Sequence, residues 1–118
     1  MKIEHKEKSK LSWEEFAQVD IRVGTVIKAE FFEKATKPAL KMLIDFGALV
    51  LKTTSAQITQ LHSPEALIDK QLIAVVNFPP KQIADMMSQC LVLGAVDDSL
   101  GVSVIGPMHK VANGTKVS

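Results

Sequence analysis

Residues 71–95, QLIAVVNFPPKQIADMMSQCLVLGA, contain two apolar runs with a polar segment between them. The runs, residues 72–78 and 90–95, have the composition of neighbouring core strands. Pro79 and Pro80 supply no backbone N–H group, and residues 81–89 are rich in polar side chains, which excludes this segment from the core. We therefore predict a polar loop held in a fixed place by two rigid strands, an arrangement common in binding sites.

The length of 118 residues fits one domain with a real hydrophobic core. Aromatic residues make up only 5% of the chain and there is no Tyr, so we expect an aliphatic core. Hydrophobic residues make up 47%, which is high for a small soluble domain. Part of this apolar area is expected to be buried between subunits.

The single cysteine, Cys90, excludes an internal disulfide, and its apolar neighbours suggest a buried thiol in a reducing compartment. No apolar run follows the charged first ten residues, as a signal peptide would require. No window approaches the roughly 18 apolar residues of a membrane span. We therefore expect a cytoplasmic protein without membrane insertion.

The charge balance gives little support to binding through a general positive field. Net charge is +1, and four of the 14 basic and two of the 13 acidic residues lie in the first ten positions. The rest of the chain then carries 10 basic against 11 acidic residues. Any anion site must depend on the local placement of lysines.

The amino-terminal half predicts one helix and three strands. Residues 1–10 are polar and aperiodic, so we assign them to a flexible tail and residues 11–118 to the domain. Ser12 and Glu15 match a capping box for a helix over residues 12–18. Strands are predicted at residues 19–29, 40–46 and 49–54. The expected inward side chains of the first two are those of Val19, Ile21, Val23, Thr25, Ile27, Ala29, Leu40, Met42, Ile44 and Phe46.

The carboxy-terminal half predicts a helix over residues 64–68, started by Ser63 and Pro64, before the two strands of residues 71–95. A turn over residues 97–101 and an extra strand over residues 102–105 follow. The interior Gly24 suggests a bulge or sharp coil in the first strand. Five strands in this order, with a helix between the third and fourth, favour a five-stranded OB-fold barrel with short flanking helices. The alternative is an open five-stranded sandwich.

Catalytic and metal sites are not indicated. His5, His62 and His109 are scattered singly, and one cysteine leaves no set of ligands at metal spacing. Neither Ser55 nor Ser88 lies in a nucleophile motif, and there is no glycine-rich phosphate loop. We predict a protein that is not an enzyme, without a metal or cofactor.

The polar groups around the Pro-Pro pair are the candidate binding residues. Lys81 is placed to contact a phosphate, while Asn77, Ser88 and Gln89 offer donors and acceptors to ribose or base edges. Lys52 and Ser55, near the end of the third strand, could line the same groove. Phe78 is expected in the core, which leaves no aromatic platform for stacking. The alternative interpretation of residues 81–89 is a solvated turn.

Five sequence blocks in this order resemble a known family. They are DIRVG (20–24), KPALKMLIDFG (37–47), TSAQIT (54–59), AVVNFPPKQI (74–83) and SQCLVLG (88–94). The chain resembles, over about residues 16–114, the tRNA-binding domain shared by CsaA proteins, carboxy-terminal extensions of some methionyl-tRNA synthetases and free-standing relatives. The NFPPKQI block is similar to CsaA proteins in particular.

The resemblance implies an OB barrel, tRNA binding, a homodimer formed outside the barrel, and a chaperone or export activity. By position it implies the same RNA-binding residues, Lys52, Ser55, Asn77, Lys81, Ser88 and Gln89. The chain departs from many relatives in having Ile83-Ala84 where they have Arg-Gly. It also has Gln89 where an acidic residue is common.

Apolar residues outside the barrel indicate how a dimer would form. The expected interface comes from the first helix and from an apolar strip over residues 102–108, and comprises Trp13, Phe16, Val104, Pro107 and Met108. The alternative is that these side chains cap the barrel within one subunit. We predict a non-catalytic homodimeric tRNA-binding protein. The alternatives are a chaperone or export factor that binds unfolded polypeptides, partly through Met86 and Met87, and an accessory domain of an aminoacyl-tRNA synthetase.

Overall fold

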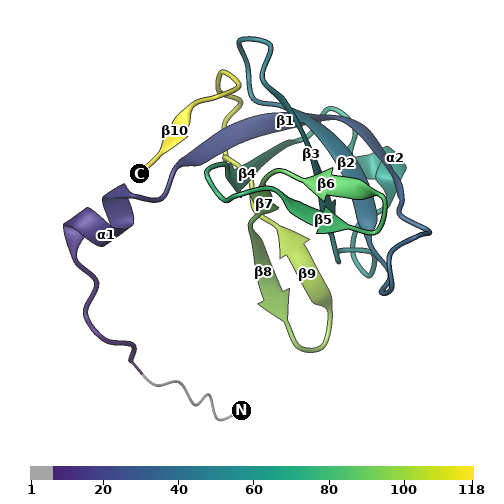
Figure 1. The fold of residues 1–118 in the computed structure, drawn as a ribbon, viewed down its shortest axis with the longest axis horizontal. Helices are drawn as coiled ribbons and strands as arrows, with labels where there is room; N and C mark the ends of the chain where they lie inside the picture. The colour runs from purple at the N-terminus through teal and green to yellow at the C-terminus, as the bar shows by residue number, and fades with distance from the viewer. Residues whose placement is uncertain (1–6) are drawn as a thin grey trace.

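The computed structural model describes residues 7–118 and shows an antiparallel sheet curled into a nearly closed barrel (Figure 1). The five barrel strands, in spatial order, are β3 (Leu51–Ala56), β2 (Leu40–Asp45), β1 (Ile21–Phe31), β4 (Gln71–Val75) and β7 (Leu91–Val92). Helix α2 (Pro64–Leu67) lies between β3 and β4 in the sequence, and the side chain of Ser63 caps it. The predicted OB-fold barrel is confirmed.

Strand β1 belongs to both halves of the barrel, since residues 21–25 pair with β4 and residues 25–31 pair with β2. At Gly24 a Cβ atom would lie 2.6 Å from Cγ2 of Ile44, so the close approach of β2 requires glycine. The register shift lies slightly further along, between Val26 and Lys28. Before this shift Val26 pairs with Ile44 and both are buried, whereas Ile27 is 37% exposed, so the prediction that Ile27 points inward is wrong. After the shift Ala29 packs against the core, as predicted.

The core is aliphatic, as the composition predicted. Alternate residues of β2 point inward as expected, and Cys90 is buried. Thr54 is the one buried polar residue of the described chain, and its hydroxyl donates to the carbonyl of Cys90 at 2.7 Å. The buried cluster consists of Val26, Leu40, Met42, Ile44, Phe46, Ile58, Leu67, Leu72, Ala74 and Cys90.

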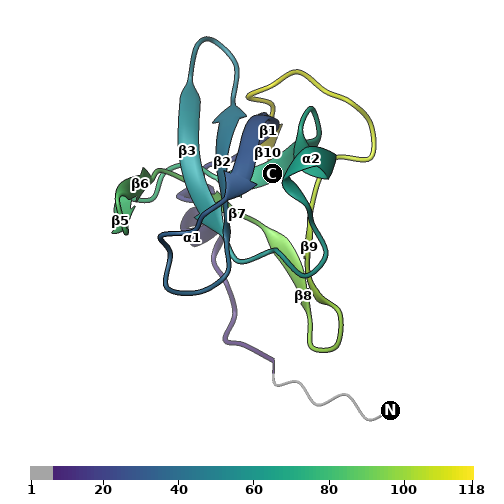
Figure 2. The same cartoon turned by 90° about the vertical axis from the view of Figure 1, so that its right-hand side faces the viewer.

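Strand boundaries differ from the predictions where the backbone turns sharply. Strand β3 begins two residues later than predicted, because Gly47, Ala48 and Leu49 all have positive φ and form the turn after β2. The run at residues 90–95 is split between β7 and β8 (Gly94–Asp97), and β8 pairs with β9 (Gly101–Val104). These last two strands form a hairpin that projects from the barrel (Figure 2).

Residues 81–89 also form strands where a loop was predicted. Strand β5 (Lys81–Ile83) pairs with β6 (Met86–Ser88), and Ala84 in the turn has a φ of 51°. That left-handed conformation favours glycine, whereas this chain has alanine there. Strands this short give too little alternation to be recognised in a sequence.

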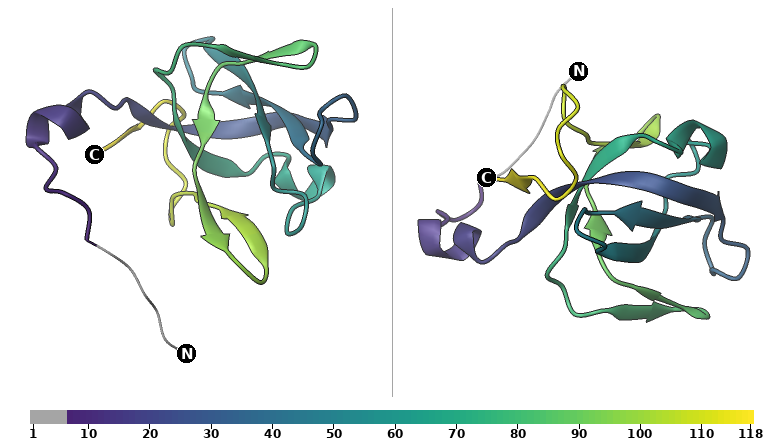
Figure 3. Two further views of the ribbon diagram at one scale, coloured as in Figure 1. Left: turned by 60° about the horizontal axis from the view of Figure 1, so that its bottom comes forward. Right: turned by 90° about the horizontal axis from the view of Figure 1, so that it is seen from above.

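The first helix and the last strand of the described residues are placed differently relative to β1. Helix α1 (Trp13–Ala17) has the predicted capping box, with Ser12 and Glu15 exchanging hydrogen bonds of 3.0 Å. It has no buried residue and stands away from the barrel (Figures 1 and 3). Strand β10 (Lys116–Val117) pairs with the start of β1. Residues 7–10 form no helix or strand, and the rest of the predicted tail, residues 1–6, lies outside the described residues.

Candidate functional site

The β5–β6 hairpin lies over β3 and is anchored at its base and at its tip (Figures 1 and 2). At the base, the backbone N–H of Gln89 donates to the carbonyl of Thr53 at 2.8 Å, and the Thr53 hydroxyl donates to the carbonyl of Met87 at 2.7 Å. At the tip, Lys34 Nζ lies 2.8 Å from Oδ2 of Asp85. The hairpin is therefore attached both to the barrel wall and to the loop between β1 and β2.

A groove runs between this hairpin, the end of β3 and the β1–β2 loop. It comprises two adjoining cavities, of about 670 and 310 Å³, that share Ser55, Lys81, Ile83 and Leu91. We call it the hairpin groove. The polar side chains along it are those of Thr36, Lys37, Ser55, Gln57, Lys81, Gln82 and Ser88.

The structure brings three of the six predicted site residues into the hairpin groove. Lys81 and Ser88 are direct cross-strand partners in the hairpin, and Ser55 of β3 lines both cavities. The Ser88 hydroxyl lies 3.2 Å from that of Thr54, which ties it to the barrel wall. A cationic ammonium group and two hydroxyl groups therefore face one shared space.

The other three residues are not among those that line the groove. The side-chain oxygen of Gln89 accepts from the backbone N–H of Thr53 at 2.9 Å, which anchors the hairpin. The amide of Asn77 accepts from the N–H of Asp20 at 3.0 Å and donates to the carbonyl of Gln18 at 2.7 Å. The contacts of Asn77 attach the segment between α1 and β1 to the chain after β4. Because the side-chain amides of Gln89 and Asn77 are both engaged within the fold, we assign both a structural role.

Lys52 is the third of these residues. It lies opposite Ile44 in the β2–β3 ladder, and its charge acts on the Cys90 thiol. Burial nevertheless dominates and raises the pKa of that thiol to about 11. The thiol is therefore protonated at neutral pH and is a poor nucleophile.

The sequence interpretation missed several groove residues. Lys37, Gln57 and Gln82 line the groove, and Lys37 and Gln57 lie inside the blocks KPALKMLIDFG and TSAQIT that carry the family resemblance. Phe78 was predicted to be core, and this is wrong, because it is 54% exposed and lines the smaller cavity. Strand β4 ends at Val75, so the residues before Pro79 have already left the sheet. The Pro-Pro pair directly after Phe78 was the feature that could have placed it outside.

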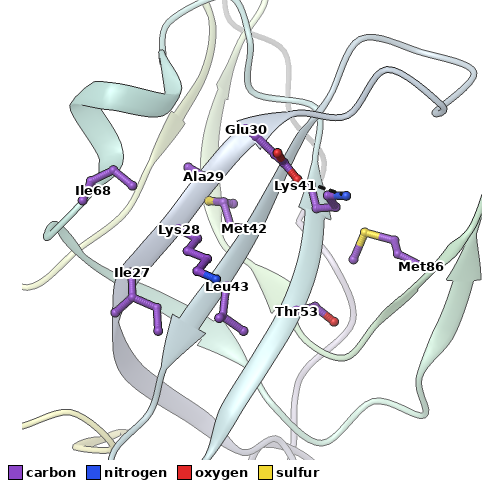
Figure 4. Close-up of a pocket in the computed structure, with 10 residues that line it drawn as sticks. All are labelled: Ile27, Lys28, Ala29, Glu30, Lys41, Met42, Leu43, Thr53, Ile68 and Met86. Carbon is purple, nitrogen blue, oxygen red and sulfur yellow. Dashed lines mark ion pairs between the residues drawn. The ribbon is translucent and has the colours of Figure 1, made fainter.

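A second groove, of about 630 Å³, lies on the outer face of β1, β2 and β3 (Figure 4). Ile68 lies on one side of it and Met86 of the hairpin on the other. Its wall includes Ile27, which is 37% exposed. Lys41 pairs with Glu30 at 3.1 Å within it. We call it the sheet groove.

Residues 7–118 contain neither a metal-binding cluster nor a membrane-spanning helix. No three His, Cys, Asp or Glu side chains in this part of the chain gather in a way that could hold a metal ion. None of its helices has both the length and the apolar composition needed to span a membrane.

A family profile described as a putative tRNA binding domain matches residues 21–116. The methionine–tRNA ligase of Porphyromonas gingivalis is 36% identical over 107 residues, which make up 91% of this chain. The aligned part spans about 15% of the length of that ligase.

Solved structures match along their whole length. The chaperone CsaA from Bacillus anthracis is 46% identical with a TM-score of 0.88, and the match covers 93% of this chain and 100% of that one. The CsaA chaperone protein from Picrophilus torridus is 43% identical with a TM-score of 0.86, and covers 92% and 100%.

Proposed function

Because this chain belongs to the putative tRNA-binding domain family, we propose that it binds tRNA through the hairpin groove, as a homodimer and without catalysis. The observation that carries this proposal is the meeting of Lys81, Ser88 and Ser55 in one groove on the β3 side of an OB barrel. OB folds use this face, together with the loops after the first and fourth barrel strands, to bind oligonucleotides. We place this activity in the cytoplasm.

The charges of the groove agree with an anionic ligand. Lys37 and Lys81 line it, and its remaining polar lining consists of neutral hydroxyl and amide groups. The two lysines come from the β1–β2 loop and the hairpin, so they flank the groove. Two locally placed lysines therefore supply the positive charge for an anionic ligand that the net charge of +1 does not.

A titration with total tRNA across a salt series tests the proposal. Few phosphates meet lysines in this groove, so the dependence of log affinity on log salt should be shallow. Lys81→Ala should weaken binding and reduce the slope by about one phosphate contact, while the unfolding transition stays unchanged. The matched control is Lys110→Ala, since Lys110 is exposed and lies outside the groove. Absence of tRNA retention by the wild-type protein at low salt would refute the proposal.

The dimer part of the proposal rests on α1 and the carboxy-terminal strip. Trp13 is 86% and Met108 is 96% exposed, and Phe16 is half-buried on the same helix as Trp13. Val104 packs against the barrel core, so this side chain also serves its own subunit. Pro107 is half-buried. Large exposed apolar residues on a projecting helix favour a partner surface on a second copy.

Light scattering at micromolar concentration checks the dimer. A mass near twice 12.9 kDa is expected for the wild type, and Trp13→Ser with Met108→Ser should shift it toward the monomer. A wild-type monomer would remove this part of the proposal without touching tRNA binding.

A second candidate function is binding of unfolded polypeptides, which the sheet groove favours. Ile27, Leu43, Ile68 and Met86 make much of its lining apolar. Two similar structures are named as chaperones. Suppression of the aggregation of a denatured client protein would support this function, and competition by tRNA would show whether the two ligands share a surface. Association with a synthetase, suggested by the ligase match, would appear as co-purification.

A further inference from the structure

Phe78 lies in the hairpin groove, at a position where an aromatic ring could stack on a ligand. It is the aromatic residue of the smaller cavity of the hairpin groove, and more than half of its side chain is exposed. The flanking Pro79 also lines the cavity and fixes its own φ angle, which limits the freedom of the backbone next to Phe78. No core contact accounts for an aromatic residue here, since Phe78 is not part of the buried cluster.

The surroundings of Phe78 combine an apolar surface with polar groups. Ile83, Cys90 and Leu91 supply further apolar lining, and Lys81, Ser55 and Ser88 supply one cation and two hydroxyl groups. The cavity measures about 310 Å³, at the lower end of the range of about 300 to 1,000 Å³ typical of ligand pockets. A flat base with its sugar and phosphate matches this mixture, because the base has an apolar face and the phosphate carries the charge.

We propose that the smaller cavity of the hairpin groove binds one unpaired nucleotide, with its base stacked on Phe78 and its phosphate at Lys81. The inference rests on the proposed function and narrows it from tRNA to an unpaired segment within the RNA. Bases in a duplex are already stacked on both sides, so only a nucleotide free of pairing offers a face to Phe78. The larger adjoining cavity, with Lys37 and Gln57, continues the path for the neighbouring nucleotide.

The test compares a single-stranded adenylate RNA of about eight nucleotides, within the site size of OB folds, with a blunt RNA duplex of the same length. The single strand carries 2-aminopurine, whose fluorescence falls when it stacks. The variants are Phe78→Leu, which keeps the apolar bulk but removes the π face, and Phe78→Trp, which keeps that face. Phe31→Leu is the matched control, since Phe31 is 59% exposed and lies outside the hairpin groove.

The wild type should bind the single strand more tightly than the duplex and quench 2-aminopurine. Phe78→Leu should lose roughly 5- to 150-fold in affinity together with the quenching, because a stacked base is worth about 1–3 kcal/mol. Phe78→Trp and Phe31→Leu should retain both. Circular dichroism and the unfolding midpoint show that each variant is folded.

Four results would overturn the inference. If Phe78→Leu binds the single strand as well as the wild type, or if the duplex binds equally well, Phe78 is not a stacking platform. If tRNA is retained while the single strand is not bound, this inference fails and the proposed function stands. If wild-type protein does not retain tRNA at all, the proposed function fails, and the inference falls with it.

Discussion

The barrel and the β5–β6 hairpin are held together in different ways. Inward side chains such as those of Leu40 and Ile44 are fully buried, and they pack around one continuous core. The hairpin has no fully buried residue in its strands, and polar contacts attach it to Thr53 and Lys34. Apolar packing therefore accounts for the stability of the barrel, and the exposed, polar-tethered hairpin carries the proposed recognition. Substitutions in the two regions should have separable effects.

The largest effect on stability is expected from Leu40→Ala, a substitution in the packed core of the barrel. Removing a fully buried leucine side chain should lower the free energy of unfolding by about 2–5 kcal/mol, through lost burial and the cavity left behind. The measurement is urea denaturation followed by circular dichroism. Leu100→Ala is the matched control, since Leu100 is 63% exposed and should stay within about 0.5 kcal/mol of the wild type. Equal losses for the two variants would contradict an apolar origin of barrel stability.

Cys90 gives the barrel a dependence on alkaline pH. Burial raises the pKa of its thiol from 9.0 to about 11, so the folded chain holds this proton more tightly than the unfolded chain does. The resulting stability is complete below pH 9 and is lost as the pH rises toward 11. The expected loss is about 2–3 kcal/mol.

Denaturation curves of the wild type and Cys90→Ala, measured between pH 8 and 11, isolate this contribution. All other ionisable groups are common to both proteins, so only the difference between the two curves belongs to the thiol. The difference should shrink or change sign as the pH rises. Parallel curves would show that the thiol titrates alike in the folded and unfolded chains.

In the hairpin groove, Lys37→Ala tests whether the RNA-binding site extends to the β1–β2 loop. Loss of one phosphate contact of typical net strength, about 1 kcal/mol, corresponds to roughly fivefold weaker tRNA binding. The salt slope should fall by about 0.7–0.9. The unfolding midpoint should not move, because Lys37 is exposed. A change in stability, or a slope equal to that of Lys110→Ala, would remove Lys37 from the site.

The same contrast explains what the sequence could predict. The barrel was predictable because Leu40, Met42, Ile44 and Phe46 alternate in a long enough run for the period to show. The inward positions of β1 do not keep one period, since Val26 faces the core before the register shift and Ala29 after it, so a continuous alternation placed Ile27 on the wrong face. Strands of three residues, as in β5 and β6, carry too few alternations to be recognised.

The site was only partly predictable for a related reason. Lys81 and Ser88 are seven positions apart in the sequence, and only the hairpin register makes them neighbours. Gln89 and Asn77 have the side chains of ligand-binding residues, but long-range partners in Thr53 and Asp20 engage them. Phe78 shows the opposite case, in which an aromatic residue beside an apolar run lies on the surface. The residue type alone suggests a role, but the contacts of the side chain in the folded chain determine that role.

The smallest effect is expected from the ion pair at the hairpin tip. A hydrogen bond from Lys34 lowers the pKa of Asp85 below its ordinary value of 3.8, and the same bond raises the pKa of Lys34 above 10.5. The contribution of Asp85 is present above pH 3.8 and is lost as the pH falls through its lowered pKa. That of Lys34 is present below pH 10.5 and is lost as the pH rises through its raised pKa. The pair is therefore intact at neutral pH, and its exposure keeps its strength small.

Asp85→Asn should therefore speed hydrogen exchange of the β5–β6 amides while leaving the barrel amides unchanged, and it should weaken tRNA binding slightly. Exchanging the charges, in Lys34→Asp with Asp85→Lys, should restore protection, because the attraction survives reversal. Glu33→Gln removes a neighbouring exposed carboxylate that makes no ion pair among residues 7–118, and it should have no effect. If Asp85→Asn instead destabilises the barrel, the two regions are energetically coupled. The separation between packed core and tethered hairpin then does not hold.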